Sequence, residues 1–293
     1  MNKTRKTFTV WTSKIMMTIA ILLTTVITFN FMPLTVQAAT NPRNYVALGD
    51  SVPYGYGLAN PETGSYTALF YRQLKILGYV DDFYNLSVNG FTTTDLLYSM
   101  RSDDSQVPLT LSKAEVITLN IGGNNILGPM IDIVNDALND LGISDVSQAT
   151  PAQLTQLTTQ LPRFTLNADQ LATLQEGVDV FSYEFPQIID EIKRAAPNAK
   201  LIVSTIYNPI PSYFALSSDA DALISAMNDV IWAGKKNYRV ADTYAVFKSV
   251  GSLVVTNFAP PVSFDIHPNA LGHSMMAFIH FKIFLKDLIP SFY

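Results

Sequence analysis

The sequence of 293 residues predicts an α/β fold, with helices packed on both faces of a parallel sheet of about five strands. Three observations lead to this prediction. From Asn44 onward, short apolar runs alternate with patterns that are typical of helices. The segments that join these runs have the length that a βαβ crossover needs. Hydrophobic residues make up 48% of the chain, which is enough for a sizeable core.

The apolar runs are the predicted strands. They cover residues 45–48, 83–86, 116–121, 201–206 and 238–241. Between the first two runs, apolar residues at helical spacing predict a helix over 65–77 that stops at Gly78. A shorter helix is predicted over 93–100, between the second and third runs.

The segment between the third and fourth runs is far longer than one crossover helix needs. The spacing of Val134, Leu138 and Leu141 predicts a helix over 131–141, with Gly142 just past its end. Further along, apolar residues spaced alternately three and four apart predict one long helix over 171–192, which could be kinked at its proline.

Between these two helices lies a third. Thr150 and Gln153 have the spacing of a capping box, Pro151 occupies the first helical position, and Pro162 ends the helix. We interpret residues 126–170 as a helical insertion that could cap a site. No linker divides the chain after residue 39 into independent domains.

The N-terminus has the pattern of a targeting segment. Four bases precede an uncharged, apolar run over residues 15–39; they are Lys3, Arg5, Lys6 and Lys14. Small residues at Val36 and Ala38 predict cleavage after Ala38, which leaves a mature chain over 39–293. Removing four bases and no acids changes the net charge from -5 to -9. The alternative is an uncleaved membrane anchor, since about 20 apolar residues can span a bilayer.

Composition excludes several kinds of partner and chemistry. Charged residues make up 15% of the chain and form no basic block after the targeting segment, so we expect no nucleic-acid partner. The chain has no cysteine, which excludes disulfides, a thiol nucleophile and a cysteine metal site. We expect neither a metal nor a cofactor.

Ser51 is a candidate nucleophile. It follows the first predicted strand in Gly49-Asp50-Ser51, and ligands of open α/β sheets bind at the carboxyl ends of the strands. Gly-Asp-Ser is also an ordinary turn composition. The Gly-x-Ser-x-Gly elbow is not matched, because Pro53 takes the place of the second glycine.

A serine nucleophile needs a base, and the chain has three histidines. His267 precedes Pro268, which favours an extended backbone and places Asp265 on the same side of the chain. Asp265 could then orient the imidazole, as the acid does in a serine, histidine and acid triad. His273 and His280 lie in a strongly apolar helical pattern, and we interpret them as packed side chains of the last helix.

Acyl transfer also needs hydrogen-bond donors for the oxyanion. Gly90 follows the second predicted strand, in a stretch that begins at Asn85, and Asn124 follows the third strand in Gly-Gly-Asn. A glycine permits close approach of the backbone, and an asparagine amide is a neutral donor.

Taken together, these motifs resemble those of the SGNH, or GDSL-type, hydrolases, a family of esterases and lipases. Ser51 matches the first block of the family, Gly90 the second, Asn124 the third, and Asp265-x-His267 the last. The resemblance implies that Ser51 is the nucleophile, His267 the base and Asp265 its orienting acid. It also implies an oxyanion hole made of the N–H groups of Ser51 and Gly90 and the side-chain amide of Asn124.

The resemblance further implies a three-layer, flavodoxin-like fold with strand order 2-1-3-4-5, formed by one SGNH hydrolase domain over 39–293. Two positions depart from the family pattern. Val52 replaces the usual leucine, which is a conservative change. Asn125 stands where many members carry aspartate, a change that affects a supporting hydrogen bond and not the oxyanion donor.

The expected function is that of an exported serine hydrolase, which cleaves lipid or other acyl esters through an acyl-enzyme. An O-acetyl esterase acting on carbohydrate or peptidoglycan is the alternative, and a non-catalytic surface protein on the same fold is a third reading. Expected partners are a small-molecule or lipid ester, with membrane contact only through the N-terminal segment or a lipid substrate. The sequence makes no prediction about oligomeric state. Aromatic residues near the motifs could line an acyl pocket; they are Tyr54, Tyr56, Phe91, Tyr207 and Phe264.

Overall fold

The computed structural model describes residues 43–289 except 103, 145, 259–262 and 264. These residues belong to one compact unit, Asn41–Tyr293, which by itself holds the sheet and the hydrophobic core. The predicted targeting segment over residues 1–38 lies outside the described residues, and so does Phe264. Within the described part of the chain, no helix combines the length and the apolar character that crossing a membrane requires.

Five parallel strands form the sheet. They are β1 (Asn44–Gly49), β2 (Asp82–Asn85), β3 (Ala114–Asn120), β4 (Lys200–Ser204) and β5 (Arg239–Ala241). Their order is β2-β1-β3-β4-β5, which confirms the predicted 2-1-3-4-5 arrangement. The register of the two central strands pairs Gly49 with Asn120, so β1 and β3 end side by side.

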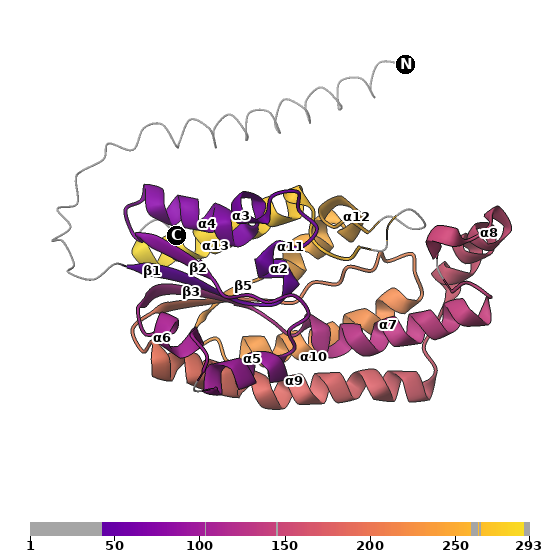
Figure 1. Cartoon of the computed structure of the whole chain (residues 1–293), viewed down its shortest axis with the longest axis horizontal. Coiled ribbons are helices and arrows are strands. Elements are labelled where there is room, and N and C mark those ends of the chain that lie inside the picture. The colour runs from indigo at the N-terminus through magenta and orange to yellow at the C-terminus, as the bar shows by residue number, and fades with distance from the viewer. Residues whose placement is uncertain (1–42, 103, 145, 259–262, 264, 290–293) are drawn as a thin grey trace, which may run out of the picture. The chain divides into compact units, whose positions relative to one another are not determined.

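Helices cover both faces of the sheet (Figure 1), as the three-layer prediction requires. On one face lie α4 (Tyr66–Ile76), α11 (Thr243–Val250) and α13 (Ala270–Leu288). On the other lie α5 (Thr93–Arg101), α6 (Val107–Leu111), α9 (Ala168–Ala195) and α10 (Leu216–Ala233). Successive residues of a strand point to opposite faces. Val46 and Leu48 therefore enter the core beneath α5 and α9, whereas Tyr45 and Ala47 enter the core beneath α4 and α13.

Side-chain caps fix where the predicted helices begin. The Ser65 hydroxyl accepts the N–H of Ala68 at the start of α4, and Gly78 follows the end of the helix with a φ of +64°. The predicted capping box of Thr150 and Gln153 is present at the start of α8 (Pro151–Gln160). A short 3-10 helix over Leu161–Arg163 then ends that segment.

A helix is present where one was predicted over 131–141, but the predicted start at Ile131 was wrong, because the helix begins eight residues earlier. Helix α7 covers Gly123–Asp140 and contains Pro129, which the sequence interpretation treated as lying before the helix. Proline donates no N–H, so it leaves the carbonyl of Asn125 without its usual partner in the helix. Gly177 of α9 packs against this carbonyl, since a Cβ there would lie 2.0 Å from the Asn125 oxygen. The neighbouring helix thus shields the gap that Pro129 leaves.

The long helix predicted over 171–192 is α9, which runs through Pro186 without interruption. The remaining short helices are α2 (Ser51–Tyr54), α3 (Pro61–Gly64), a 3-10 turn over Val146–Gln148 and α12 (Ser252–Val255). Helices α2, α7 and α12 lie at the end of the sheet where the strands finish (Figure 1).

Candidate active site

Ser51 lies just after the carboxyl end of β1. A sharp turn at Gly49 and Asp50 joins the strand to α2, whose first residue is Ser51. Gly49 has a φ of +142°, and a Cβ there would lie 1.8 Å from the backbone oxygen of Asn120. Only glycine fits between the two central strands at this point. Asp50 follows and caps α2, because its Oδ1 accepts the N–H of Val52 at 3.0 Å. The turn places the Ser51 hydroxyl at the strand end.

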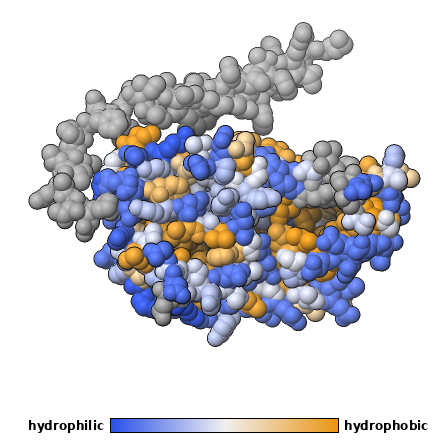
Figure 2. All heavy atoms as spheres, in the orientation of Figure 1, coloured by the Kyte–Doolittle hydropathy of each residue, from blue (hydrophilic) through white to orange (hydrophobic). Residues whose placement is uncertain are grey.

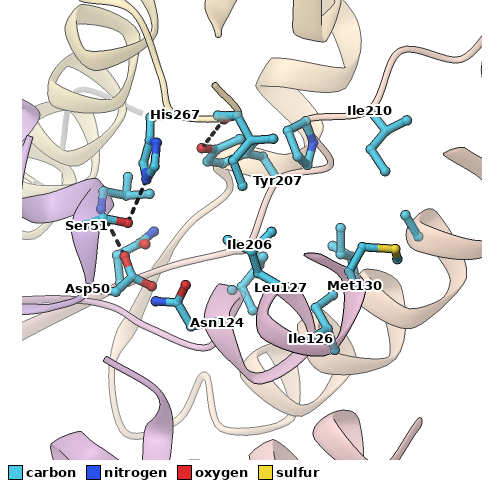
Figure 3. Close-up of a pocket in the computed structure, with 17 residues that line it drawn as sticks. Asp50, Ser51, Asn124, Ile126, Leu127, Met130, Ile206, Tyr207, Ile210 and His267 are labelled. Carbon is cyan, nitrogen blue, oxygen red and sulfur yellow. Dashed lines mark hydrogen bonds between the residues drawn. The ribbon is translucent and has the colours of Figure 1, made fainter. Parts of the chain in front are cut away.

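The Ser51 hydroxyl and the His267 imidazole are within hydrogen-bonding distance (Figure 3). Ser51 Oγ lies 2.9 Å from His267 Nε2. On the other side of the ring, His267 Nδ1 lies 2.6 Å from Asp265 Oδ1. A carboxylate only accepts, so Nδ1 carries the proton and Nε2 is free to accept the proton of the serine hydroxyl. The structure therefore brings together the three side chains that the sequence motifs singled out. The backbone N–H of His267 also donates to Asp265 Oδ1, at 3.0 Å.

Asn257, a residue that sequence reasoning missed, holds the other oxygen of the carboxylate. Its Nδ2 donates to Asp265 Oδ2 at 3.0 Å, while its backbone N–H donates to the carbonyl of His267 at 2.9 Å. Gly57 leaves room for this pair, since a Cβ there would lie 2.9 Å from Asp265 Oδ2 and 3.0 Å from Asn257 Nδ2. No local pattern announces Asn257, because its role arises from the fold of the loop.

Aromatic groups support the histidine segment from two sides. The buried Tyr207 hydroxyl donates to the carbonyl of Ile266 at 3.0 Å. The ring of Tyr56 lies 4.6 Å from the imidazole of His267, centroid to centroid. An antiparallel bridge between Thr256 and Pro268 anchors the segment beyond the imidazole. The backbone on either side of His267 is therefore fixed.

The three candidate oxyanion donors differ in how the structure places them. Ser51 opens α2, and the first N–H groups of a helix have no partner within it. Asn124 lines the pocket beside Ser51, and its Nδ2 donates one hydrogen bond to the carbonyl of Phe91 at 2.9 Å. An amide carries two hydrogens, so the second remains for a ligand. Gly90 is exposed with a φ of +82°, and it is not among the residues that line the pocket.

The departure at Asn125 has a structural role. Its Oδ1 accepts the N–H of Thr93 at 3.1 Å, and its Nδ2 donates to Thr93 Oγ1 at 2.8 Å. The Thr93 hydroxyl is thereby directed outward and donates to Glu184 Oε2 at 2.6 Å. A carboxylate at position 125 would compete with Glu184 for that hydroxyl proton. Asn125 of α7 thus holds the first residue of α5, which in turn is bonded to α9.

Asp50 is buried beside the serine and faces the pocket (Figure 3). Burial raises the pKa of its carboxyl from its usual range to about 7, and the hydrogen bond from Val52 opposes this shift only in part. The carboxyl next to Ser51 is therefore protonated more easily than that of an exposed aspartate.

An apolar pocket leads away from Ser51 and His267. Most of its walls come from α7, from the loop after β4 and from α10. The apolar residues that these three segments contribute are Ile126, Leu127, Met130, Ile206, Tyr207, Pro209, Ile210, Ala220 and Ile224, and Val52 and Ile266 line the pocket beside Ser51 and His267. In Figure 2, apolar side chains gather around a hollow beside the position that α7 occupies in Figure 1. The α7 wall belongs to the predicted insertion, whereas the contribution of α10 was not foreseen.

The aromatic residues predicted to line this pocket lie in different places in the structure. Tyr207 lines it. Tyr54 and Tyr56 are exposed, and Phe91 packs against the core beneath α5 and α9. The prediction that these aromatics line a pocket therefore holds for Tyr207 alone among the described ones.

His273 and His280 are packed side chains of α13, as the sequence indicated. His273 Nδ1 accepts the N–H of Tyr66 at 3.1 Å. His280 Nδ1 donates to the carbonyl of Met276 at 2.7 Å, and its Nε2 accepts from the Ser204 hydroxyl at 3.0 Å. Burial lowers the pKa of each imidazole to about 4. Within the described ranges, no group of three or more acidic or histidine side chains could hold a metal ion.

Comparisons with known proteins bear on the whole chain. The sequence model of the GDSL-like Lipase/Acylhydrolase family matches residues 47–275, which include every site residue discussed above. Among curated proteins, none matches the chain.

Solved structures share the fold. A lipase, Lip_vut3, from a goat rumen metagenome has a TM-score of 0.56 at 18% identity, covering 82% of this chain and 97% of its own. Phospholipase A1 from Streptomyces albidoflavus NA297 has a TM-score of 0.56 at 16% identity, covering 83% and 99%. An extracellular lipase from Streptomyces rimosus has a TM-score of 0.53 at 19% identity, covering 82% and 99%. At these identities the likeness shows a common fold.

Proposed function

The chain belongs to the GDSL-like lipase/acylhydrolase family and is a carboxylic ester hydrolase; from that premise we propose that it cleaves esters with an apolar acyl chain, through an acyl-enzyme on Ser51. One observation carries the proposal: Asp265, His267 and Ser51 are linked by hydrogen bonds at the mouth of an apolar pocket. This order of contacts suits Ser51 as the nucleophile, His267 as the base and Asp265 as the acid that orients the base.

In the acylation step, Ser51 Oγ attacks the ester carbonyl carbon while His267 Nε2 takes the hydroxyl proton. The carbonyl oxygen becomes an oxyanion, for which the N–H groups of Ser51 and Gly90 and the Asn124 amide are the proposed donors. The intermediate then collapses: the bond to the alcohol oxygen breaks, and the alcohol leaves with the proton from Nε2. Ser51 keeps the acyl group.

In the deacylation step, a water molecule takes the place of the alcohol. His267 Nε2 removes one of its protons, and the resulting hydroxide attacks the acyl carbon. Collapse of the second intermediate releases the carboxylic acid and returns the proton to Ser51 Oγ. Asp265 stays ionised throughout and stabilises the imidazolium that forms in each step.

The pocket favours an acyl chain longer than acetate. Its walls beyond Ser51 are aliphatic, from Ile126 on α7 to Ile224 on α10. An acetyl group would leave most of this apolar surface in contact with water, whereas each buried CH₂ of a longer chain contributes about 0.8 kcal/mol. Lipid-like esters therefore fit the pocket better than the acetyl groups of a carbohydrate.

A series of p-nitrophenyl esters from acetate to palmitate tests the proposal. We expect kcat/KM to rise with acyl length to a maximum beyond acetate, and Ser51→Ala to lower kcat by at least about 10⁴-fold. Full activity in Ser51→Ala would contradict the mechanism. A preference for acetate, together with release of acetate from acetylated sugars, would instead favour the O-acetyl esterase.

Ala220→Leu tests the acyl pocket separately, because Ala220 lines the pocket from α10 and touches none of the reacting groups. The larger side chain should lower kcat/KM for octanoate about tenfold or more and leave that for acetate nearly unchanged. Acetate hydrolysis serves as the internal control for folding. Equal losses on both esters would argue against an acyl pocket at this place.

Export is a further part of the proposal, and it is supported by the sequence pattern of residues 1–38. We expect the mature protein to begin at Ala39 and to be found outside the cell. N-terminal sequencing of the protein from culture medium tests this. A protein that stays with the membrane fraction and retains residues 1–38 would support the anchored alternative.

A further inference from the structure

We infer that the surface formed by α12 and the start of α13 docks this protein on an uncharged lipid–water interface. The surface is defined by three exposed side chains, Leu253 and Val254 of α12 and Leu271 of α13. The inference rests on the proposed function, because a lipid-like ester is presented to an enzyme at such an interface.

The sequence around this surface is almost free of charge. Between Lys248 and Lys282, a stretch of 33 residues, the only residue with a formal charge is Asp265. At the 15% charged fraction of the whole chain, about five charges would be expected. Asp265 is itself bonded to His267 and Asn257, so it adds no free charge to the surface.

The exposed positions in this stretch are apolar or small. Among its described residues, they are Ser249, Val250, Leu253, Val254, Ala270, Leu271, Ser274 and Phe278. Solvent-facing positions are ordinarily occupied by lysine, glutamate and other charged residues. Leu253 and Val254 are each 48% exposed and Leu271 is 49% exposed, so their side chains are available to a partner.

Hydrogen bonds join this surface to the histidine segment. Asn269 Nδ2 donates to the carbonyl of Val254 at 2.9 Å, and Asn269 Oδ1 accepts the N–H of Leu271 at 3.0 Å. The chain continues from α12 into Asn257, which is paired with His267. Helix α12 also lies at the end of the sheet where α2 presents Ser51 (Figure 1). An interface that contacted α12 would therefore lie next to the mouth of the pocket.

The absence of charge selects the kind of lipid. Anionic headgroups are recognised by clusters of lysine and arginine, and the stretch 249–281 contains neither. The chain as a whole is acidic, with a net charge of -5. Binding by apolar side chains alone depends on the apolar area that enters the interface, and zwitterionic lipid does not repel an acidic protein. The predicted occupant is a zwitterionic or neutral lipid surface.

Sedimentation with phosphatidylcholine vesicles tests the inference. The protein used is residues 39–293, which contains the complete compact unit without the targeting segment. It carries Ser51→Ala, so that no lipid is consumed. We expect this protein to sediment with the vesicles and Leu253→Glu/Leu271→Glu to bind at least about tenfold more weakly. The matched control is Ile76→Glu/Leu109→Glu, which changes two apolar residues on α4 and α6 that are even more exposed than Leu253 and Leu271, and it should bind like the parent.

Activity on a soluble ester separates this inference from the proposed function. With Ser51 intact, all forms should hydrolyse p-nitrophenyl butyrate at the same rate, which also shows that the variants fold. Absence of butyrate hydrolysis with vesicle binding intact would overturn the proposed function and not the surface. Three results would overturn the surface: no binding by the parent, equal binding by both double variants, or binding only to vesicles that contain anionic lipid. A dimer that Leu253→Glu/Leu271→Glu disrupts, without vesicle binding, would reassign the surface to self-association.

Discussion

His267 and the pair His273 and His280 are the same residue type in neighbouring segments, yet their surroundings differ. The side chain of His267 is 16% exposed and lies between a carboxylate and a serine hydroxyl. His273 and His280 are completely buried. The Nδ1 atoms of both rings contact backbone groups, His280 Nε2 contacts a hydroxyl, and His273 Nε2 has no hydrogen-bond partner among the described residues. Each imidazole is held in place by at least one hydrogen bond, so a fixed position of the ring does not distinguish His267 from the other two.

The difference lies in what each site does to a proton. Burial without a nearby carboxylate disfavours the imidazolium, and it lowers the pKa of His273 and His280 to about 4. Asp265 gives His267 the opposite environment, in which an imidazolium formed during a reaction is stabilised. A buried histidine thus needs both an acid and an open side before it can act as a base.

Replacing His267 should have the largest effect on activity. His267→Gln keeps a polar side chain of similar size but removes the base, and kcat on a soluble ester should fall by about 10⁴-fold or more. A stopped assay with high enzyme concentration can measure the residual rate. If the variant kept a tenth of the activity, another base would have to serve Ser51.

Asp265→Asn should come next. An amide can donate to His267 Nδ1, which would favour the wrong tautomer and leave the imidazolium without a countercharge, so kcat should fall by about 10⁴-fold or somewhat less. Circular dichroism and the thermal midpoint should remain close to those of the parent. Near-normal activity would show that His267 needs no acid, and the contrast with the two buried histidines would lose its basis.

Asn257→Ala should have a smaller effect. The change removes the donor to Asp265 Oδ2 and leaves the carboxylate oriented by Oδ1 alone. A hydrogen bond to a charged group contributes about 1.5–3 kcal/mol, so kcat should fall by about tenfold or more, with KM for a soluble ester unchanged. An increase in KM without a change in kcat would indicate a role in substrate binding and not in positioning the acid.

The buried pair should affect stability and not activity. The unfolded chain binds protons at both histidines below pH about 6.5, whereas the folded chain resists protonation down to about 4. Their contribution is therefore fully present above 6.5 and is lost as the pH falls, by up to about 3 kcal/mol for each residue. His273→Asn/His280→Gln keeps an acceptor at each place and removes the titration.

Urea unfolding at several pH values between 4 and 7 measures this effect. The free energy of unfolding of the double variant should depend less steeply on pH than that of the parent. Its activity at pH 7.5 should stay within about twofold, because neither histidine contacts the pocket. An unchanged pH dependence of unfolding would show that other groups dominate acid destabilisation.

Much of the fold could be predicted from local patterns. A strand that is buried on both faces is a short apolar run, and all five runs are strands within two residues of their predicted bounds. The sequence also predicts part of the site, because a tight turn requires glycine and a catalytic triad requires particular side chains. These residues are Gly49, Ser51 and the Asp265-x-His267 motif. The capping box at Thr150 is local for the same reason.

Other features depend on contacts between distant residues, and no local pattern reveals them. Helix α7 begins at Gly123 and continues through Pro129, since Gly177 of α9 packs against the Asn125 carbonyl that the proline leaves without a partner. Asn257 contacts Asp265 because the loop folds back. Ala220 and Ile224 reach the pocket because α10 packs on α9, as α7 does. Residue type and spacing set the strands, the turn at Ser51 and the chemistry available there. Only the packing of helices and loops in the tertiary structure decided the depth of the pocket and the hydrogen bond from Asn257 to Asp265. These contacts join residues that no local pattern of the sequence connects.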